Sequence, residues 1–286
     1  MPEMQTMFSS GSTVAALQRQ SPLDALETRI LLMHALRMTR IELITRSERI
    51  PGAEELQLLN SLVQRRIAGE PIAYIVGQRE FFGLPFRVSK DVLIPRPETE
   101  LLVELALQRA PHGARLLDMG TGSGAIAVVL AHARADLQVS ALDVSAAALE
   151  VARDNAARNL AHGGTLRLLQ SDWYAALQTG EQFELIVSNP PYIVAGDAHL
   201  SQGDLRFEPI GALTDHADGL SALRTIVSGA AAHLAPDGWL LMEHGFDQAA
   251  PVRELLLAAG YRQVQSWQDL AGIERVTGGI RPLATA

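Results

Sequence analysis

The chain has 286 residues, 48% of them hydrophobic, and a formal net charge of −8. This length and apolar content indicate a globular protein with one large or two modest domains. The absence of cysteine excludes disulfides, thiolate metal sites and cysteine nucleophiles. The net negative charge disfavours a protein held to a nucleic-acid backbone by charge alone. The sequence shows no basic stretch followed by a long apolar run at its start, and its longest apolar stretch (124–133) is too short to span a bilayer. We therefore expect a soluble, cytoplasmic protein that does not bind membranes.

The first zone of the chain, residues 1–80, is predicted to be a small helical domain. Ser21-Pro22 is a favourable helix start, with the serine as N-cap and the proline in the first turn. Pro51 interrupts the helical pattern and Gly69 ends it. The apolar residues that recur at helical spacing are Leu23, Leu26, Ile30, Met33 and Leu36, then Leu56, Leu59, Leu62, Val63 and Ile67. No strand-like alternation is present, so a helical bundle is predicted.

The second zone, residues 81–97, is predicted to be a β-hairpin that links two domains. Residues 81–88 are aromatic and β-branched around Gly83 and Pro85. Residues 94–98 contain too many prolines for a central strand or for the interior of a helix.

The third zone, residues 98–286, alternates predicted strands with predicted helices. Strands are predicted at 116–119, 139–142, 166–169, 183–187 and 239–242, and helices at 124–134, 146–160 and 220–234. This alternation predicts an α/β domain built on a mostly parallel, doubly wound sheet.

A glycine-rich segment, Asp118-Met119-Gly120-Thr121-Gly122-Ser123-Gly124, follows the first strand and opens a helix. Its glycines let the backbone approach a ligand closely, and the helix start supplies free amide groups. Asp143 ends the next strand, where a carboxylate can accept both hydroxyls of a ribose. A tight turn without a ligand is the plainer alternative, and a nicotinamide dinucleotide also fits the pattern. Asp118 favours S-adenosyl-L-methionine, because a carboxylate repels a pyrophosphate and attracts the cationic sulfonium and amino groups. The predicted cofactor-binding residues are thus Asp118, Gly120, Thr121, Gly122, Ser123, Gly124 and Asp143.

Asp172-Trp173 lies at the end of the third strand. There an acid can hold the adenine amino group and an indole can stack on the adenine ring. Taken alone, the pair is more typical of a buried tryptophan beside a surface acid. Its position at a third carboxyl strand end favours a role in cofactor binding.

The strongest motif is Asn189-Pro190-Pro191-Tyr192, which follows the buried strand 183–187. Ligands bind outside the carboxyl ends of strands in such sheets, so Asn189 is expected to face both the cofactor and the methyl acceptor. The Asn189 side-chain oxygen and the Pro190 carbonyl can accept the two N–H bonds of a planar nitrogen and aim its lone pair. Tyr192 can offer a flat face, and the two prolines fix the backbone. We predict that Asn189, Pro190 and Tyr192 are catalytic and that Pro191 joins them in binding substrate. A proline-rich turn without function is the alternative.

With these residues placed, the chain resembles the bacterial protein-(glutamine-N5) methyltransferases that modify peptide chain release factors. The matching segments are 70–74, 81–84, 94–100, 118–124, 143, 172–173, 189–192 and 274–276. The resemblance implies a class I (Rossmann-like) S-adenosylmethionine-dependent methyltransferase sheet, joined by a β-hairpin to a small all-α N-terminal domain. It implies as substrate the glutamine of a Gly-Gly-Gln loop in release factors, held by Asn189, Pro190 and Tyr192. Residues 96–100 separate this group from relatives that act on a ribosomal protein.

Other functions remain open from the residues alone. An adenine N6 methyltransferase shares Asn-Pro-Pro-Tyr but needs a flipped base and a basic channel, which the acidic charge disfavours. A non-catalytic S-adenosylmethionine-binding module and a nicotinamide-dependent reductase are further alternatives. We predict no metal site, because the sequence has no His-Glu-x-x-His motif, and it also has no phosphate-binding Gly-Lys-Ser/Thr loop. We also expect a monomer without direct nucleic-acid contact.

Overall fold

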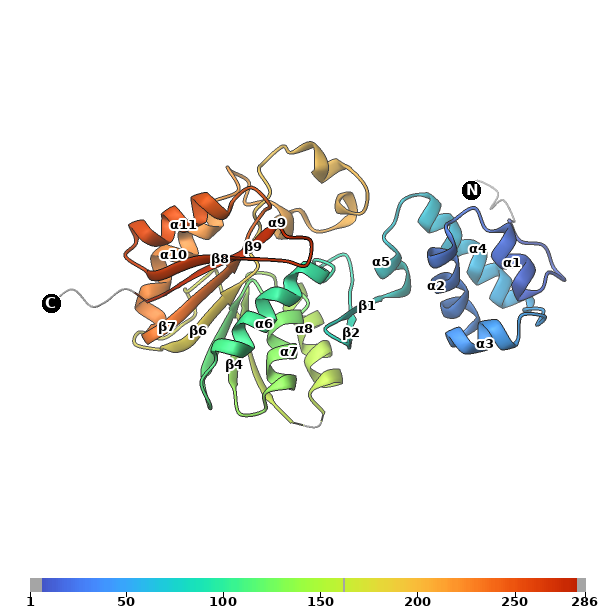
Figure 1. Cartoon of the computed structure of the whole chain (residues 1–286). Coiled ribbons are helices and arrows are strands. Elements are labelled where there is room, and N and C mark those ends of the chain that lie inside the picture. Colours follow the sequence, from blue (N-terminus) through green and yellow to red (C-terminus); the bar gives the residue numbers. More distant parts are fainter. Residues whose placement is uncertain (1–6, 162, 282–286) are drawn as a thin grey trace. The chain divides into compact units, whose positions relative to one another are not determined.

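The computed structural model describes residues 7–161 and 163–281. The chain forms two compact units, which meet in sequence between Gly77 and Gln78 (Figure 1). The sequence places the end of the helical domain after residue 80, inside the first strand, whereas the two units of the structure divide three residues earlier. Within the described residues, no helix has both the length and the apolar character needed to cross a membrane.

The first unit is helical, as the sequence predicts. Its helices are α1 (Val14–Gln20), α2 (Ala25–Leu36), α3 (Arg40–Thr45), α4 (Ala53–Ile67) and α5 (Ile72–Val76). Leucines from α1, α2 and α4, including Leu17, Leu31 and Leu59, form one buried core. The periodicity of α2 and α4 is visible in the sequence. The helices α1, α3 and α5 have seven, six and five residues, which is too short for a pattern to show.

The predicted start of α2 is wrong. Asp24, not Ser21, is its N-cap, and the Asp24 carboxylate accepts the backbone N–H groups of Leu26 and Glu27 at 2.8 and 3.0 Å. Ser21 ends α1 instead, and its hydroxyl accepts a hydrogen bond from Thr28. Both residue types are good caps. Asp24 is the cap of α2, because it directly precedes the first helical residue and its carboxylate accepts hydrogen bonds from two backbone amides.

The second unit begins with an antiparallel hairpin of β1 (Gln78–Phe81) and β2 (Leu84–Arg87). Phe81 and Phe86 are buried in the core of this unit, so the hairpin belongs to it structurally. The hairpin packs on helix α8 (Ala146–Asn159). There the buried Asn155 accepts the N–H of Arg87 at 2.7 Å and donates to the Arg87 carbonyl at 3.0 Å.

The rest of the second unit surrounds a seven-stranded sheet of order β5-β4-β3-β6-β7-β9-β8. Its strands are β3 (Arg115–Met119), β4 (Gln138–Asp143), β5 (Thr165–Gln170), β6 (Phe183–Ser188), β7 (Leu234–Glu243), β8 (Arg262–Gln268) and β9 (Glu274–Ile280). The first five of these run parallel to one another, and β9 is antiparallel to both of its neighbours, β7 and β8. This confirms the predicted mostly parallel sheet.

Helices cover both faces of the sheet (Figure 1). They are α6 (Glu100–Arg109), α7 (Ala125–Ala133), α8, α10 (Ser221–His233) and α11 (Ala249–Ala258). On β3, Leu116 packs with α6 and α7, whereas its neighbour Leu117 packs with α10 and α11. Strands buried on both faces read as continuous apolar runs, which is why β3, β6 and the end of β7 are visible in the sequence.

Several elements differ from the sequence prediction. Strand β7 begins at Leu234, before the predicted 239, because an irregular stretch around Asp237 extends it. Helices α6 and α11 and strand β8 were not predicted, and β8 alternates half-buried with exposed residues. Short elements occupy the connections: η1 (Pro97–Thr99), η2 (Ala198–Ser201), η3 (Leu205–Phe207) and α9 (Ile210–Leu213).

The register of the parallel strands sets the position of the predicted site. Met119 of β3 pairs with Leu142 of β4 and with Ser188 of β6, and Ser188 pairs with Met242 of β7. The residues that follow these positions therefore emerge together at the carboxyl edge of the sheet. They are Gly120, Asp143, Asn189 and Glu243.

Candidate active site

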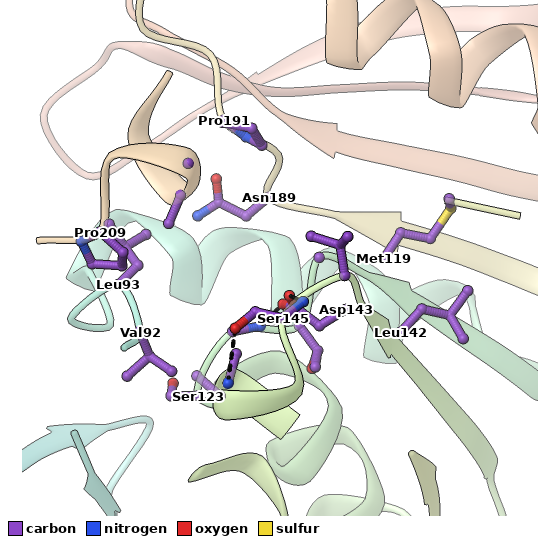
Figure 2. A pocket seen from close by; sticks show the side chains of 18 of the residues that line it. Val92, Leu93, Met119, Ser123, Leu142, Asp143, Ser145, Asn189, Pro191 and Pro209 are labelled. Carbon is purple, nitrogen blue, oxygen red and sulfur yellow. Dashed lines mark hydrogen bonds between the residues drawn. The ribbon is translucent and has the colours of Figure 1, made fainter. Parts of the chain in front are cut away.

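A cavity of about 300 Å³ opens at the carboxyl ends of β3, β4, β5 and β6 (Figure 2). That volume is at the lower end of small-molecule sites. The predicted cofactor residues that line it are Gly120, Thr121, Gly122, Ser123, Asp143, Asp172 and Trp173. Of the predicted acceptor residues, Asn189 and Pro191 line the cavity. Asp118, Gly124, Pro190 and Tyr192 do not, although each directly adjoins a residue that does.

The three glycines of the loop have two different roles. Gly120 and Gly122 have φ of 73° and 54°, and a Cβ added at either would have no atom within 4 Å. A side chain there would thus occupy the cavity itself. Gly124 has φ of 80°, but its Cβ would lie 3.1 Å from the Ala152 Cβ on α8. Gly120 and Gly122 therefore keep the cavity open, and Gly124 lets α7 and α8 pack closely.

The backbone of the glycine loop is held by its own hydrogen bonds. The amides of Gly120 and Thr121 both donate to the Leu142 carbonyl at 2.9 Å, and the Gly124 amide donates to the Thr121 carbonyl at 2.8 Å. The Gly122 amide donates to Asp143 Oδ2, also at 2.8 Å. These four amides are therefore already paired and are not the free amide groups that the sequence predicts at the helix start. The loop offers a ligand a rigid, open surface instead.

Asp143 is fixed at the rim of the loop by both of its oxygens. Oδ2 accepts the Gly122 amide, and Oδ1 accepts the Ser145 amide at 2.9 Å. Burial raises the pKa of Asp143, while the amides of Ser145 and Gly122 lower it. Each carboxylate oxygen has a further lone pair, so the side chain can still accept the hydroxyls of a ribose.

Asp118 lies beneath the loop and is fully buried. Its Oδ2 accepts a 2.6 Å hydrogen bond from the Thr121 hydroxyl, whereas its Oδ1 has no partner among the described residues. Burial raises the pKa of Asp118 to about 7 despite the Thr121 hydrogen bond. A buried carboxylate with an unsatisfied oxygen is stabilised by a nearby cation. An open glycine cradle above such a group fits a cationic, phosphate-free cofactor.

Trp173 and Asp172 form the far wall of the cavity, after β5. Trp173 is half-buried with φ of 46°, a left-handed conformation that is uncommon for such a large residue and clusters at ligand sites. The Ser171 hydroxyl holds this turn by donating to the Trp173 carbonyl at 2.7 Å. Asp172 is exposed. The indole is thus positioned at the cavity by its backbone, while the Asp172 carboxylate is accessible.

Asn189 extends from the end of β6 into the cavity (Figure 2). Its Nδ2 donates to the Thr99 hydroxyl at 3.2 Å, and its Oδ1 has no partner among the described residues. The oxygen is therefore available to accept a hydrogen bond from a ligand. Thr99 also lines the cavity and lies at the end of η1, before α6.

Tyr192 is directed toward the buried Glu243 at the end of β7. The Tyr192 hydroxyl donates to Glu243 Oε1 at 3.4 Å, and the Tyr192 carbonyl accepts from Gln248 Nε2 at 2.9 Å. Burial and the nearby Glu243 raise the pKa of the Tyr192 phenol well above its usual value. Tyr192 therefore keeps its proton and acts as a hydrogen-bond donor.

Two segments that the sequence did not assign to the site complete the cavity wall. Residues 91–96 and 209–212 contribute Val92, Leu93, Pro95, Arg96, Pro209, Gly211 and Ala212. Glu208 joins the segments, because its carboxylate accepts the Ile94 amide at 3.1 Å and forms an ion pair with Arg96. The proline-rich run at 94–98 was the only signal for this wall. No group of three His, Cys, Asp or Glu side chains suited to a metal ion lies within the described ranges.

Comparison with known proteins is consistent with this site. The family model "PrmC N-terminal domain" matches residues 12–77, and "Methyltransferase small domain" matches residues 97–204. The release factor glutamine methyltransferase of Burkholderia pseudomallei is 57% identical, with 98% of this chain and 100% of that protein covered. That of Neisseria gonorrhoeae is 51% identical over 91% of this chain and 94% of that protein. A methyltransferase structure from Pyrococcus furiosus has a TM-score of 0.54 at 21% identity, covering 77% of this chain and 98% of that one, which shows the shared fold.

Proposed function

The chain belongs to the family of release factor glutamine methyltransferases, and on that basis we propose its reaction and the residues that carry it out. It transfers a methyl group from S-adenosyl-L-methionine to the side-chain amide nitrogen of the glutamine in the Gly-Gly-Gln loop of peptide chain release factors. The observation that carries this proposal is the Asn189 amide oxygen at the cavity, which has no partner among the described residues, while the amide nitrogen is anchored by Thr99.

The cofactor would be held by the glycine loop and the three carboxyl strand ends beside it. Gly120 and Gly122 leave space for it, Asp143 would accept the ribose hydroxyls, and Trp173 would stack on the adenine. The Asp118 carboxylate beneath the loop would balance its positive charge. When bound, the cofactor supplies an electrophilic methyl group on a sulfonium.

The chain's own contribution is to orient a poor nucleophile. The lone pair of an amide nitrogen is delocalised, so it attacks only when it is held in line and allowed to pyramidalise. We propose that Asn189 Oδ1 accepts one N–H of the substrate amide and that the Pro190 carbonyl accepts the other. Pro191 and Tyr192 support this arrangement. Such preorganised acceptors raise electron density on the nitrogen and cost no reorganisation during the reaction.

No strong base is required at the acceptor. The nitrogen becomes cationic and acidic once it is methylated, so its proton can leave to water. Tyr192 does not take this proton, since burial keeps its phenol protonated. The net charge of −8 supports a protein substrate over a nucleic-acid one. Action in the cytoplasm as a monomer, without nucleic-acid contact, remains a prediction.

The proposal is tested by mass spectrometry of a purified release factor after incubation with this protein and isotope-labelled S-adenosyl-L-methionine. One added methyl on the Gly-Gly-Gln glutamine is expected, and a release factor with that glutamine replaced by alanine is the matched control. Duplex and single-stranded DNA are incubated in parallel. Label on adenine, or label that persists in the alanine control, would contradict the proposal.

A further inference from the structure

Gln248 lies at the N-cap position of α11, but its side chain does not cap that helix. The residue is only 8% exposed, and its amide bonds to other parts of the chain. Its Oε1 accepts the backbone N–H of Gly245 at 2.9 Å. Its Nε2 donates to the Tyr192 carbonyl at 2.9 Å and to the Gly219 carbonyl at 3.2 Å. The side chain therefore joins the end of the acceptor motif to the segments that precede α10 and α11.

These contacts fix the orientation of the Gln248 amide. A side-chain amide has two N–H donors and one carbonyl oxygen, and all three groups are engaged here. If the amide turned over, its oxygen would face two carbonyl oxygens and its NH₂ group would face an N–H. None of the three hydrogen bonds would then form, and the buried backbone groups would be left without partners. The chemistry of this position therefore requires an amide side chain.

Gly219 makes room for the contact between Gln248 and Tyr192. It has φ of 77°, and a Cβ at this position would lie 2.5 Å from the Tyr192 carbonyl oxygen and 2.8 Å from Gln248 Nε2. Any side chain at this position would push the Gln248 amide away from the Tyr192 carbonyl. The close approach therefore requires a glycine here, as the backbone conformation also does.

The segment that Gln248 holds is stiff, and the sheet fixes its other end. Ser188 is the last residue of β6, and its buried hydroxyl donates to a carbonyl of β3 at 2.7 Å. Pro190 and Pro191 have a fixed φ, and each restricts the residue before it to an extended backbone. Few torsions between Ser188 and Tyr192 therefore remain free. Once the Tyr192 carbonyl is held, the directions of the Asn189 side chain and of the Pro190 carbonyl are restricted as well.

We propose that Gln248 is a positioning residue for methyl transfer: its hydrogen bonds to Tyr192 and Gly219, here called the Gln248 clamp, hold the two acceptor oxygens of Asn189 and Pro190 in place. This inference rests on the proposed function, in which those oxygens accept the two N–H groups of the substrate amide. Gln248 does not line the cavity, so it acts through the motif and not by contact with a ligand. Because both oxygens must point at one nitrogen, a small displacement of the motif is expected to slow the reaction.

Two substitutions of Gln248 test the clamp by kinetics. Gln248→Met keeps the length of the side chain and removes all three hydrogen bonds, whereas Gln248→Glu keeps an acceptor for the Gly245 amide and loses at least one of the two donors. With cofactor and release factor saturating, we expect kcat to fall about tenfold in both variants, the effect of roughly one hydrogen bond. The KM for release factor and the calorimetric affinity for S-adenosyl-L-methionine should stay within about threefold, because Gln248 contacts neither ligand. Gln108→Met and Gln108→Glu, at an exposed position of α6, are the matched controls.

Gly219→Ala tests the same clamp without changing Gln248. Its methyl would displace the Gln248 amide from the Tyr192 carbonyl, so kcat should fall at least as far as in Gln248→Met. Gly180→Ala is the matched control, since Gly180 has φ of 84° and no atom within 4 Å of an added Cβ. Because Gly219→Ala and Gln248→Met break the same contact, the double variant should be no slower than the slower single variant.

Amide hydrogen exchange gives a readout that does not depend on activity. The Ile193 and Ala195 amides follow the motif directly and donate to the Leu213 and Ala217 carbonyls at 2.9 Å. Both amides should exchange faster in Gln248→Met, because the loop is released at its clamped end, while the amides of β3 and β4 keep their protection. Unchanged exchange after the motif would refute the clamp.

The outcomes separate this inference from the proposed function. If the unaltered protein methylates the loop glutamine and both Gln248 variants keep their full kcat, or if the effects of Gly219→Ala and Gln248→Met multiply, the clamp is refuted and the function stands. If the unaltered protein does not methylate the glutamine, the function itself fails, and hydrogen exchange still shows whether Gln248 holds the loop. A purely structural role would lower cofactor affinity together with kcat and speed exchange throughout the sheet, which would also refute the inference. Should Gln248→Met fail to fold, Gln248→Glu and Gly219→Ala decide.

Discussion

Substituting alanine for glycine at two positions of the same loop should lower mainly the cofactor affinity at one position and mainly the stability at the other. Both Gly120 and Gly124 have left-handed φ, of 73° and 80°. An alanine in that conformation costs about 1–2 kcal/mol, partly offset by a stiffer unfolded chain. At Gly120 nothing lies within 4 Å of the added methyl, so this backbone term is the whole cost to stability. At Gly124 the methyl would also lie 3.1 Å from the Ala152 Cβ and 3.3 Å from its Cα.

The second contact adds a packing cost at Gly124. Overpacking of this kind costs about 1–3 kcal/mol, because α7 and α8 must move apart. We therefore expect Gly124→Ala to destabilise the protein by about 3 kcal/mol and Gly120→Ala by about 1 kcal/mol. For a domain of this size those values correspond to decreases in melting temperature of about 6–12 °C and about 2–4 °C.

Cofactor affinity should show the reverse order. The Gly120→Ala methyl enters the cavity, so S-adenosyl-L-methionine should bind about tenfold or more weakly, whereas Gly124→Ala should bind nearly normally at a temperature where it is folded. Differential scanning calorimetry without cofactor and isothermal titration with it measure the two effects. Gly113→Ala is the matched control, since it has φ of 71° with no atom within 4 Å and lies outside the cavity lining. If Gly120→Ala binds cofactor as well as Gly113→Ala, Gly120 does not keep the cofactor cavity open. If Gly124→Ala is as stable as Gly120→Ala, the close packing of α7 on α8 does not require a glycine.

Three further predictions follow from buried polar groups. Asn155→Ala removes hydrogen bonds to both backbone groups of Arg87 and to the Ser123 carbonyl. We therefore expect the free energy of unfolding to fall by about 3 kcal/mol and amide hydrogens in residues 78–87 to exchange faster. Unchanged protection of these amides would contradict the prediction. Because the pKa of Asp118 is about 7 and a cationic ligand favours the ionised carboxylate, such a ligand should bind more tightly at pH 8 than at pH 6. In calorimetric titrations, Asp118→Asn should remove this part of the pH dependence. Identical pH profiles for the variant and the unaltered protein would contradict the prediction. Glu243 is protonated up to about pH 7 in the folded protein but ionises near its ordinary pKa of 4.5 in the unfolded chain, so the folded state loses about 3 kcal/mol of stability as the pH rises through this interval. In thermal unfolding from pH 5 to pH 8, the unaltered protein should therefore lose stability relative to Glu243→Gln. A stability difference that stays constant over this pH range would count against the prediction.

The sequence predicts those parts of the site that are formed by consecutive residues. The glycine loop 120–124 and the motif 189–192 each follow a buried apolar strand, and the parallel sheet brings their strand ends together. The apolar runs of the central strands and the glycines at their ends are local features, so strand type and the edge on which the site lies could be predicted without knowing the register.

The parts that were not predicted depend on contacts between distant residues. Thr99 meets Asn189 across 90 positions of the chain, and Glu208 meets Ile94 across 114. A single acid after a strand, such as Glu243, resembles any surface carboxylate until the register of β6 and β7 places it beside Asn189. The cap of α2 was mistaken for a related reason, because Ser21 and Asp24 both suit a helix start and only the backbone amides distinguish them.

In the proposed reaction, the Asn189 side-chain oxygen holds the acceptor nitrogen in line for methyl transfer. The single-turnover rate of Asn189→Ala, with cofactor and release factor both saturating, measures this contribution. Removing one preorganised group of this kind typically costs about 10²–10³ in rate, so we expect a fall of at least about 100-fold, with cofactor affinity unchanged. A rate within a few-fold of the unaltered protein would show that the Asn189 oxygen does not hold the acceptor nitrogen.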